Sequence, residues 1–379
     1  MKKMFAGRRL LACAVFSLFA AVFIVLGGCK FSGQETEDDE DEETGRSIKI
    51  MTWNVNNLFD GKDNGYEYDE FREAAGWSAE KYLGRINVIS AAIDSVEPKP
   101  DIIVLQEIES LAILEDLASS MSGGYSWSHF ANNRGAALGL GVLSRFPLSD
   151  SKVHSITIGS DTTPRPVLET RIQSDEGAFV IFACHWKSKL GGDDVTENIR
   201  RASARVILRR IRELWENEPD TGVIVTGDLN ENHDEFYRRQ ASVICALLPD
   251  DLYSAQLAGC LGEDSERIAD LQKDFIVLSR NKPPSPVNFP QGTVVLFSPW
   301  ISDLENGSYF YKHDWETIDH FLVSGQFFDN SGLEYEKVII VNNPYFSNAS
   351  GIPVSYNVRT GTGLSDHLPL LLVINVMSK

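Results

Sequence analysis

Cysteine is scarce in this chain, and what there is cannot be fully paired. Five cysteines occur among 379 residues. Cys13 and Cys29 lie in an N-terminal leader, which leaves an odd number for the rest of the chain. Cys184 lies inside an apolar run and is expected to be a buried small hydrophobic residue. Cys245 and Cys260 close a short loop, so a disulfide between them and two free thiols both stay open from the sequence.

Residues 47–379 lack two further features, a Pro/Gly/Ser-rich linker and an internal repeat. Their absence predicts one large domain rather than two small ones. Basic residues are also in deficit, with 35 Lys and Arg against 54 Asp and Glu and a formal net charge of −19. An acidic surface repels polyanions at long range, which disfavours tight nucleic-acid binding without metal ions or local basic groups. It does not exclude an enzyme that turns a polyanion over.

The N-terminal leader has a composition of its own. Four basic residues precede an apolar stretch over residues 10–26. The stretch is nearly long enough to span a bilayer, so an uncleaved anchor is one interpretation. The small residues before Cys29 favour a secretory signal instead, and Leu26-Gly27-Gly28-Cys29 resembles the bacterial lipobox, in which the cysteine is lipidated.

We therefore expect a signal peptide over residues 1–28 and a lipidated Cys29 that begins a tether over residues 29–46. Eight of the nine residues from Glu35 to Glu43 are acidic, and their mutual repulsion should keep the tether extended. The domain over residues 47–379 would then be exported and lipid-anchored at a bacterial cell envelope. No obligate protein partner is evident, and a monomer is expected.

Polar residues follow four short apolar runs and precede two others. The runs are rich in β-branched and aromatic residues and are bounded by polar or turn residues, which predicts buried strands. If all six polar ends meet, four strands run toward the meeting point and two run away. That arrangement requires mixed sheets with substantial antiparallel pairing. The polar ends are Asn54, Glu107, His185 and Asp228 after their runs, and Asp319 and Asp366-His367 before theirs.

Two amphipathic helices are predicted between the strands. Ser78 can cap the first, whose apolar positions follow a 3.6-residue period until Pro98 stops it. Thr196 can cap the second, which would turn Ile199, Ala202, Ile207, Ile211 and Leu214 inward. Its arginines would then form an outward face, comprising Arg200, Arg205, Arg209 and Arg212. Helices outside mixed sheets give a layered α/β sandwich.

Seven short motifs together carry a resemblance to the endonuclease/exonuclease/phosphatase superfamily, the DNase-I-like hydrolases. They occur in the order of the family over roughly residues 47–376. The resemblance implies a four-layered sandwich of two mixed, largely antiparallel β-sheets flanked by helices, and metal-dependent cleavage of phosphate esters. The motifs are Thr52–Asp60, Leu105-Gln106-Glu107, Thr163–Pro166, His185–Lys189, Gly227–Asn230, Thr317–His320 and Ser365-Asp366-His367.

A phosphodiesterase needs a cation on the phosphate oxygens, because the transition state gathers negative charge. Glu107 is the best candidate for direct ligation of a hard divalent ion. Asn54 and Asp366 could complete the shell directly or through water, since Mg²⁺ keeps most of its waters. We expect Mg²⁺ or Mn²⁺, with Ca²⁺ as a further candidate.

Several side chains could activate water and stabilise charge. His367 is the candidate general base, because a histidine near its ordinary pKa can take a proton from water, and Asp319 is its expected orienting acid. The resemblance implies that Asp228 orients the water and Asn230 donates to the phosphate. Their two-residue spacing would place both on one side of an extended segment. His185 would donate to the phosphate or the leaving oxygen.

Three basic residues could bind the phosphate. Arg165, between two prolines, is held in a restricted backbone that can aim a bidentate donor. Lys187 and Lys189 lie on one side if their segment is extended. Surface salt bridges and solvated lysines are the alternative interpretation of all three.

Three functions stay open from the sequence. The first is a nuclease, in particular an endonuclease, that hydrolyses DNA or RNA. The second is a phosphodiesterase or phosphatase for sphingomyelin, another phospholipid headgroup or an inositol phosphate, which an exposed aromatic hairpin within residues 289–300 would favour. The third is a surface-binding lipoprotein without catalysis. Residues 248–311 carry no family motif and are expected to form the rim of the cleft.

Overall fold

The six apolar runs form the centres of two β-sheets. The computed structural model describes residues 46–240, 242–252, 273–287 and 289–377. One sheet has six strands in the order β17 (Leu333–Ile340), β18 (Leu370–Val376), β1 (Ser47–Leu58), β2 (Ile102–Ile108), β4 (Gly139–Ser144) and β3 (Trp127–Ala131). The other has eight in the order β11 (Leu247–Pro249), β12 (Ile276–Ser279), β13 (Val295–Phe297), β16 (Asp319–Val323), β10 (Gly222–Asp228), β9 (Gly177–His185), β8 (Val167–Ser174) and β5 (Leu148–His154).

The remaining elements are helices and two small hairpins. The α-helices are α1 (Ala79–Asp94), α2 (Leu111–Ser120), α3 (Asp193–Asn217) and α4 (Glu235–Arg238). Short 3₁₀ turns occur at Asp69–Phe71, Glu73–Ala75, Asp250–Leu252, Pro299–Ile301 and Gly325–Phe327. The hairpins pair β6 (Thr157–Ile158) with β7 (Asp161–Thr162), and β14 (Tyr309–Tyr311) with β15 (Asp314–Glu316).

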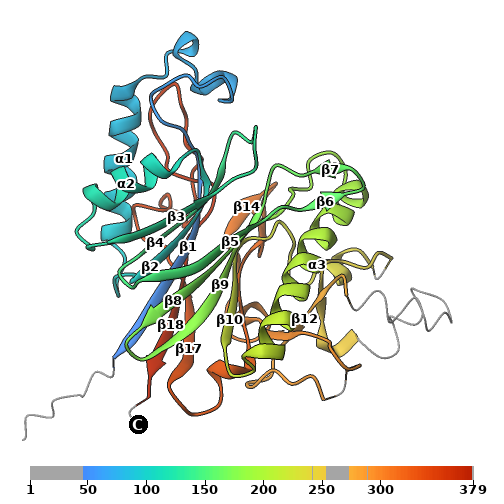
Figure 1. The fold of residues 1–379 in the computed structure, drawn as a ribbon. Helices are drawn as coiled ribbons and strands as arrows, with labels where there is room; N and C mark the ends of the chain where they lie inside the picture. Colours follow the sequence, from blue (N-terminus) through green and yellow to red (C-terminus); the bar gives the residue numbers. More distant parts are fainter. Residues whose placement is uncertain (1–45, 241, 253–272, 288, 378–379) are drawn as a thin grey trace, which may run out of the picture. The chain divides into compact units, whose positions relative to one another are not determined.

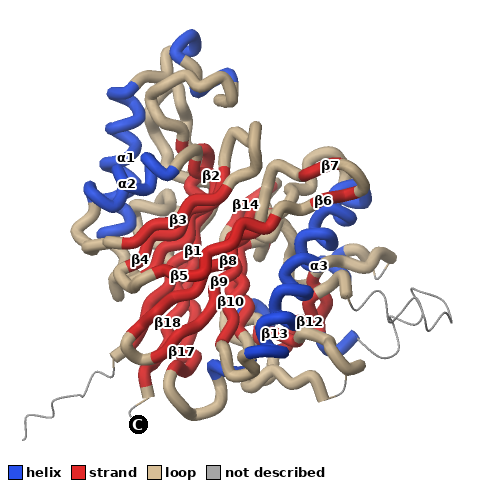
Figure 2. Tube along the Cα trace, viewed as in Figure 1, coloured by secondary structure: helices blue, strands red, loops and turns tan. Residues whose placement is uncertain are grey.

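Residues Gly45–Lys379 form one compact unit built in four layers. The two sheets pack face to face over a core to which both contribute, for example Ile50 and Ile102 from one and Ile181 and Phe321 from the other. Helices α1 and α2 cover the outer face of the six-stranded sheet, and α3 covers the outer face of the eight-stranded one (Figures 1 and 2). The expected four-layered sandwich is confirmed.

Strand directions also agree with the sequence. β1 and β2 are parallel, and β18 pairs antiparallel with β1. In the second sheet β9 and β10 are parallel, and β16 pairs antiparallel with β10. Four strands therefore end, and two begin, at the edge where the polar residues lie.

The leader and tether fall outside the described residues, so the predictions for Cys29 and for residues 1–45 stay predictions. Among the residues that are described, no helix combines the length and apolar character needed to cross a bilayer. Cys184 and Cys245 are buried free thiols, as expected for Cys184. Cys260 also lies outside the described residues.

One helix starts as expected and the other does not. The hydroxyl of Ser78 accepts a hydrogen bond from the Lys81 amide and caps α1, whose apolar positions are buried. Helix α3 begins at Asp193, with Gly192 as its cap residue. Thr196 is therefore inside the helix, where its hydroxyl donates back to the carbonyl of Gly192 at 3.0 Å. The prediction that Thr196 caps α3 was wrong.

The expected position of Arg200 on an outward face was also wrong. Its side chain is completely buried, whereas Arg205 and Arg209 are exposed as expected. The guanidinium lies 2.7 Å from Glu197 and 3.1 Å from Glu231, and it donates to the Lys187 carbonyl at 3.1 Å. A buried arginine needs such partners, because an unpaired buried charge is costly.

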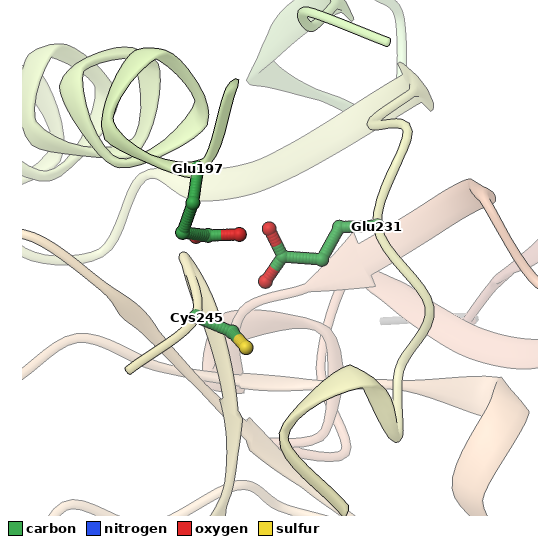
Figure 3. Close-up of side chains that lie close together, drawn as sticks. All are labelled: Glu197, Glu231 and Cys245. Carbon is green, nitrogen blue, oxygen red and sulfur yellow. The ribbon is translucent and has the colours of Figure 1, made fainter. Parts of the chain in front are cut away.

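Arg200 thereby joins α3 to two loops that leave neighbouring strands. Lys187 follows β9, and Glu231 follows β10. The carboxylate of Glu231 also accepts the Leu247 amide at 2.7 Å, and that of Glu197 accepts the Ala246 amide at 2.9 Å. Figure 3 shows the two carboxylates facing each other beside Cys245. This ion-pair network fixes the backbone just beyond His185 and Asp228.

Candidate active site

Strand register places three polar side chains abreast. In the eight-stranded sheet, His185 of β9 is paired with Asp228 of β10, and Asp228 is paired with Asp319 of β16. Residues paired in register point to the same face of a sheet. All three side chains therefore leave the sheet on the same side, at the edge where their strands begin or end.

The six-stranded sheet contributes Asn54 and Glu107 through irregular pairing. The register of β1 with β2 shifts after Asn54, and that of β2 with β4 shifts between Gln106 and Ile108. Glu107 has a φ of 66°, a conformation that L-residues adopt rarely. Bulges of this kind re-aim a side chain at the end of a strand. Here the carboxylate of Glu107 accepts the Asn57 amide at 2.8 Å.

Hydrogen bonds and close contacts join the two sheets at this edge. The side-chain nitrogen Nδ2 of Asn54 donates to the carboxylate of Glu107 at 3.2 Å and to that of Asp228 at 3.1 Å. The Nε2 atom of His185 lies 3.4 Å from Asp228 and 3.7 Å from Glu107. The predicted metal-binding and catalytic residues therefore come together across the interface between the sheets.

The turn before β18 is tied to β1. The hydroxyl of Ser365 donates to the Asn54 carbonyl at 2.6 Å and accepts the His367 amide at 3.0 Å. The indole of Trp53 donates to the His367 carbonyl at 3.0 Å. These bonds hold Asp366 and His367 beside the residues at the end of β1.

His367 and Asp319 form a hydrogen-bonded pair, with Nδ1 2.8 Å from the carboxylate. The same carboxylate oxygen accepts the Ser308 hydroxyl at 2.6 Å. Burial alone would lower the pKa of His367, but the adjacent Asp319, together with Asp366 and Asp228, raises it to about 10. With the charges of the protein alone, the pKa of His367 is therefore not near its ordinary value as had been expected, because three carboxylates surround the imidazole.

Asp228 and His185 are shifted toward their neutral forms. Burial and the neighbouring Asp319 raise the pKa of Asp228 to about 7. Burial, with the positive charges of Arg165, His367 and Lys187, lowers the pKa of His185 well below its usual value. A neutral imidazole still has one N–H to donate.

The predicted residues line one cavity of about 690 Å³, except for Lys187 and for Asp319, which lies behind His367. Arg165 lies at its wall, where its guanidinium donates to the Trp186 carbonyl. Lys187 instead lines an adjoining pocket that shares Arg165 and His185. Lys189 lines the cavity, but it is paired with Glu235 at 2.7 Å. Lys187 and Lys189 would share one side only if their segment were extended; strand β9 ends at His185, and the two lysines line different cavities.

Asn230 reaches the cavity by a different route from the one expected. Strand β10 ends at Asp228, and Asn230 has a φ of 51°, so the segment is a turn rather than extended. The Asn230 amide donates to the Asp228 carboxylate at 2.9 Å, and its side chain donates to the Trp186 carbonyl at 3.2 Å. Both residues line the cavity, although the geometric argument for it was incorrect.

Four residues of the site were missed in the sequence. Ser308 bonds to Asp319, and Tyr309, Tyr311 and Lys312 line the cavity from the hairpin β14–β15. The alternation Tyr309-Phe310-Tyr311 is a strand signal with one tyrosine face. It spans only three residues, which is too short to be decisive without the structure.

A family model matches a large part of the chain. Residues 49–244, more than half of the chain, match the model described as "Endonuclease/Exonuclease/phosphatase family". The chain belongs to the endonuclease/exonuclease/phosphatase family. Its range of match contains Asn54, Glu107, His185 and Asp228. The His367–Asp319 pair lies beyond that range, with Asp319 on β16 and His367 in the turn before β18.

The chain is also similar to several solved structures. Truncated TDP2 from Caenorhabditis elegans is 15% identical, with a TM-score of 0.47 and coverage of 87% of this chain and 98% of that one. An endonuclease/exonuclease/phosphatase family protein from Bacteroides thetaiotaomicron is 15% identical, with a TM-score of 0.48 and coverage of 88% of this chain and 96% of that one. The human Nocturnin catalytic domain is 17% identical, with a TM-score of 0.48 and coverage of 87% of this chain and 95% of that one. No match was found among curated proteins.

The family's divalent metal fits the oxygen-rich side of the cavity. Glu107 and Asp366 keep 15% and 29% of their side chains exposed, so a cation can reach both carboxylates. Hard divalent cations prefer such oxygen donors. The three residues predicted to hold the ion, Glu107, Asn54 and Asp366, all line this cavity.

A second acidic cluster, within the described part of the chain, is less suitable. Glu197, Glu231 and Cys245 offer ligand atoms within 4.8 Å of one another. Arg200 already supplies the cation there, and backbone amides take the other carboxylate oxygens. Burial and the nearby Glu197 raise the pKa of Glu231 well above its usual value. This cluster is a structural ion-pair network.

The His367–Asp319 pair predicts non-additive kinetics. His367→Ala should lower kcat/KM by roughly 10²- to 10⁴-fold, as expected for loss of a general base. Asp319→Ala should cost a comparable factor, because the imidazole loses its orientation and tautomer. The double variant should be hardly worse than His367→Ala, since the two residues act as a unit. Fully additive losses in log kcat/KM on a phosphodiester would show that they work independently.

Proposed function

We propose that this protein is a divalent-metal-dependent phosphodiesterase, and specifically a nuclease that cuts DNA or RNA within the strand. The observation that carries the proposal is the cavity itself. His367, which is paired with Asp319, lines a cavity of about 690 Å³ together with Asp228, Glu107, Asn54 and Arg165. A base, oxygen ligands and phosphate donors around one space are the groups that phosphodiester hydrolysis needs.

The chain's own residues have distinct roles in this proposal. His367, held by Asp319, would take the proton of the attacking water. Asp228 would orient that water, while His185 and Asn230 would donate to the phosphate and Arg165 would bind its oxygens. A divalent cation held by Glu107, Asn54 and Asp366 would neutralise charge on the phosphate and offset the carboxylates that keep the His367 pKa high.

Residues 289–300 do not provide the lipid-binding feature that was considered for them. An exposed aromatic hairpin within residues 289–300 would have favoured a lipid. Phe297 is completely buried, and Trp300 is 4% exposed with its indole bonded to the Asp319 carbonyl. Those aromatic residues belong to the protein interior, whereas Tyr311 of β14 is 47% exposed at the cavity.

We further propose that the enzyme is lipid-anchored through Cys29 at the bacterial cell envelope. The support is the basic and apolar leader before Leu26-Gly27-Gly28-Cys29 and the acidic segment after it. In a bacterial host, Cys29→Ser should release the full-length chain from the membrane fraction or leave it unprocessed. An unchanged acylated membrane fraction would rule the anchor out.

A substrate panel tests the activity. The soluble domain from Gly45 would be incubated with circular plasmid DNA, RNA, sphingomyelin and inositol phosphates, each with Mg²⁺, Mn²⁺, Ca²⁺ or a chelator. We expect Mg²⁺ or Mn²⁺ to convert the plasmid to nicked and linear forms, and the chelator to stop the reaction. His367→Ala is the matched control for a contaminating nuclease.

Two results of the panel would contradict the proposal. Cleavage of only sphingomyelin or inositol phosphates would keep the phosphodiesterase and reject the nuclease. Lack of cleavage of every substrate with every metal would favour the binding lipoprotein without catalysis.

A further inference from the structure

The hairpin β14–β15 brings aromatic rings to the catalytic histidine. Tyr309 and Tyr311 alternate on β14 and therefore share one face, and their rings stack with centroids 6.1 Å apart and planes 19° apart. The Tyr309 ring lies 4.7 Å from the imidazole of His367, at 35°. The three rings form a row from the general base toward solvent.

The hairpin is held firmly in this position. Phe310 points away from the tyrosines and packs against Trp315 of β15, with centroids 5.1 Å apart. The Leu368 amide donates to the Ser308 carbonyl at 2.7 Å, and Tyr309 pairs with His367 as a β-bridge. The tyrosine face is therefore positioned before any substrate arrives.

The outer end of the row is accessible and polar at its margins. Tyr311 is 47% exposed and lines the same cavity as Asp228 and His367. The Lys312 ammonium lies 5.0 Å from the centre of its ring. Asp314 and Glu316 occupy the paired positions on β15. A lipid chain would need an apolar surface around the tyrosines. Flat tyrosine rings with polar groups at their edges are better suited to bind a ligand whose aromatic ring is surrounded by charged groups.

We propose that Tyr311, supported by Tyr309, is a stacking platform for the nucleobase next to the scissile phosphate. Every base has a π-face, so such a platform binds without reading sequence. It favours single-stranded or unpaired substrate, because bases in a duplex are already stacked on each other. The platform rests on the proposed nuclease function and names its preferred substrate.

The test removes the Tyr311 ring and the flanking nucleobases, separately and together. Wild type, Tyr311→Phe and Tyr311→Ala would be assayed on a single-stranded oligonucleotide, and on the same oligonucleotide with abasic residues flanking the cleaved bond. Tyr311→Ala should raise KM for the normal oligonucleotide by roughly 5- to 100-fold, from the usual strength of base–aromatic stacking. Tyr311→Phe should retain wild-type KM, and kcat should change little.

Two comparisons separate stacking from a general defect. On the abasic oligonucleotide, Tyr311→Ala should have the same KM as wild type. On a duplex, the increase in KM caused by Tyr311→Ala should be smaller than on the normal single strand. Tyr345→Ala removes another exposed tyrosine, 52% exposed and outside the cavity, and should change nothing. Thermal unfolding of each variant checks that the fold is intact.

The outcomes are distinguishable from failure of the proposed function. Wild type that cleaves no nucleic acid would overturn the nuclease and the platform together. Wild type that cleaves the oligonucleotide, with Tyr311→Ala unimpaired or equally impaired on the abasic substrate, would overturn the platform alone.

Discussion

Repulsion between carboxylates is the constraint on which this site depends. Asp228 and Asp319 are directly paired on neighbouring antiparallel strands, and both are almost fully buried. Like charges in that arrangement are destabilising. The chain offsets part of the charge by placing His367 against Asp319 and Arg165 at the wall of the same cavity.

The fold holds these groups together by fixing the strand ends. Register aligns His185, Asp228 and Asp319 in one sheet, while bulges in the other turn Asn54 and Glu107 toward them. The loops beyond the strands are then anchored from behind. The buried Arg200 holds the loops after β9 and β10, where it compensates the negative charge of Glu197 and Glu231.

The sequence allowed the strands, their directions and the layers to be predicted, because each strand is an apolar run with a polar end. It could not predict local backbone turns, so the extended geometry expected for Asn230 was wrong. The burial of Arg200 could not be predicted either. Helical periodicity does not reveal that folding places a carboxylate, that of Glu231, beneath the helix. The tyrosines of β14 were missed because their strand is so short. The catalytic and metal-binding roles stay predictions, although the structure places nearly all of the proposed residues around one cavity.

The central claim is that Glu107 binds a divalent cation that the other carboxylates need. Calorimetric titration of the domain with Mg²⁺ tests it most directly. Glu107→Ala should lose most of the binding heat while its thermal midpoint stays within a few degrees of wild type, because a strand-end ligand is not a core residue. Glu109→Ala, two residues along and outside the cavity, should keep the binding heat. Full Mg²⁺ binding by Glu107→Ala, with wild-type activity, would contradict the account.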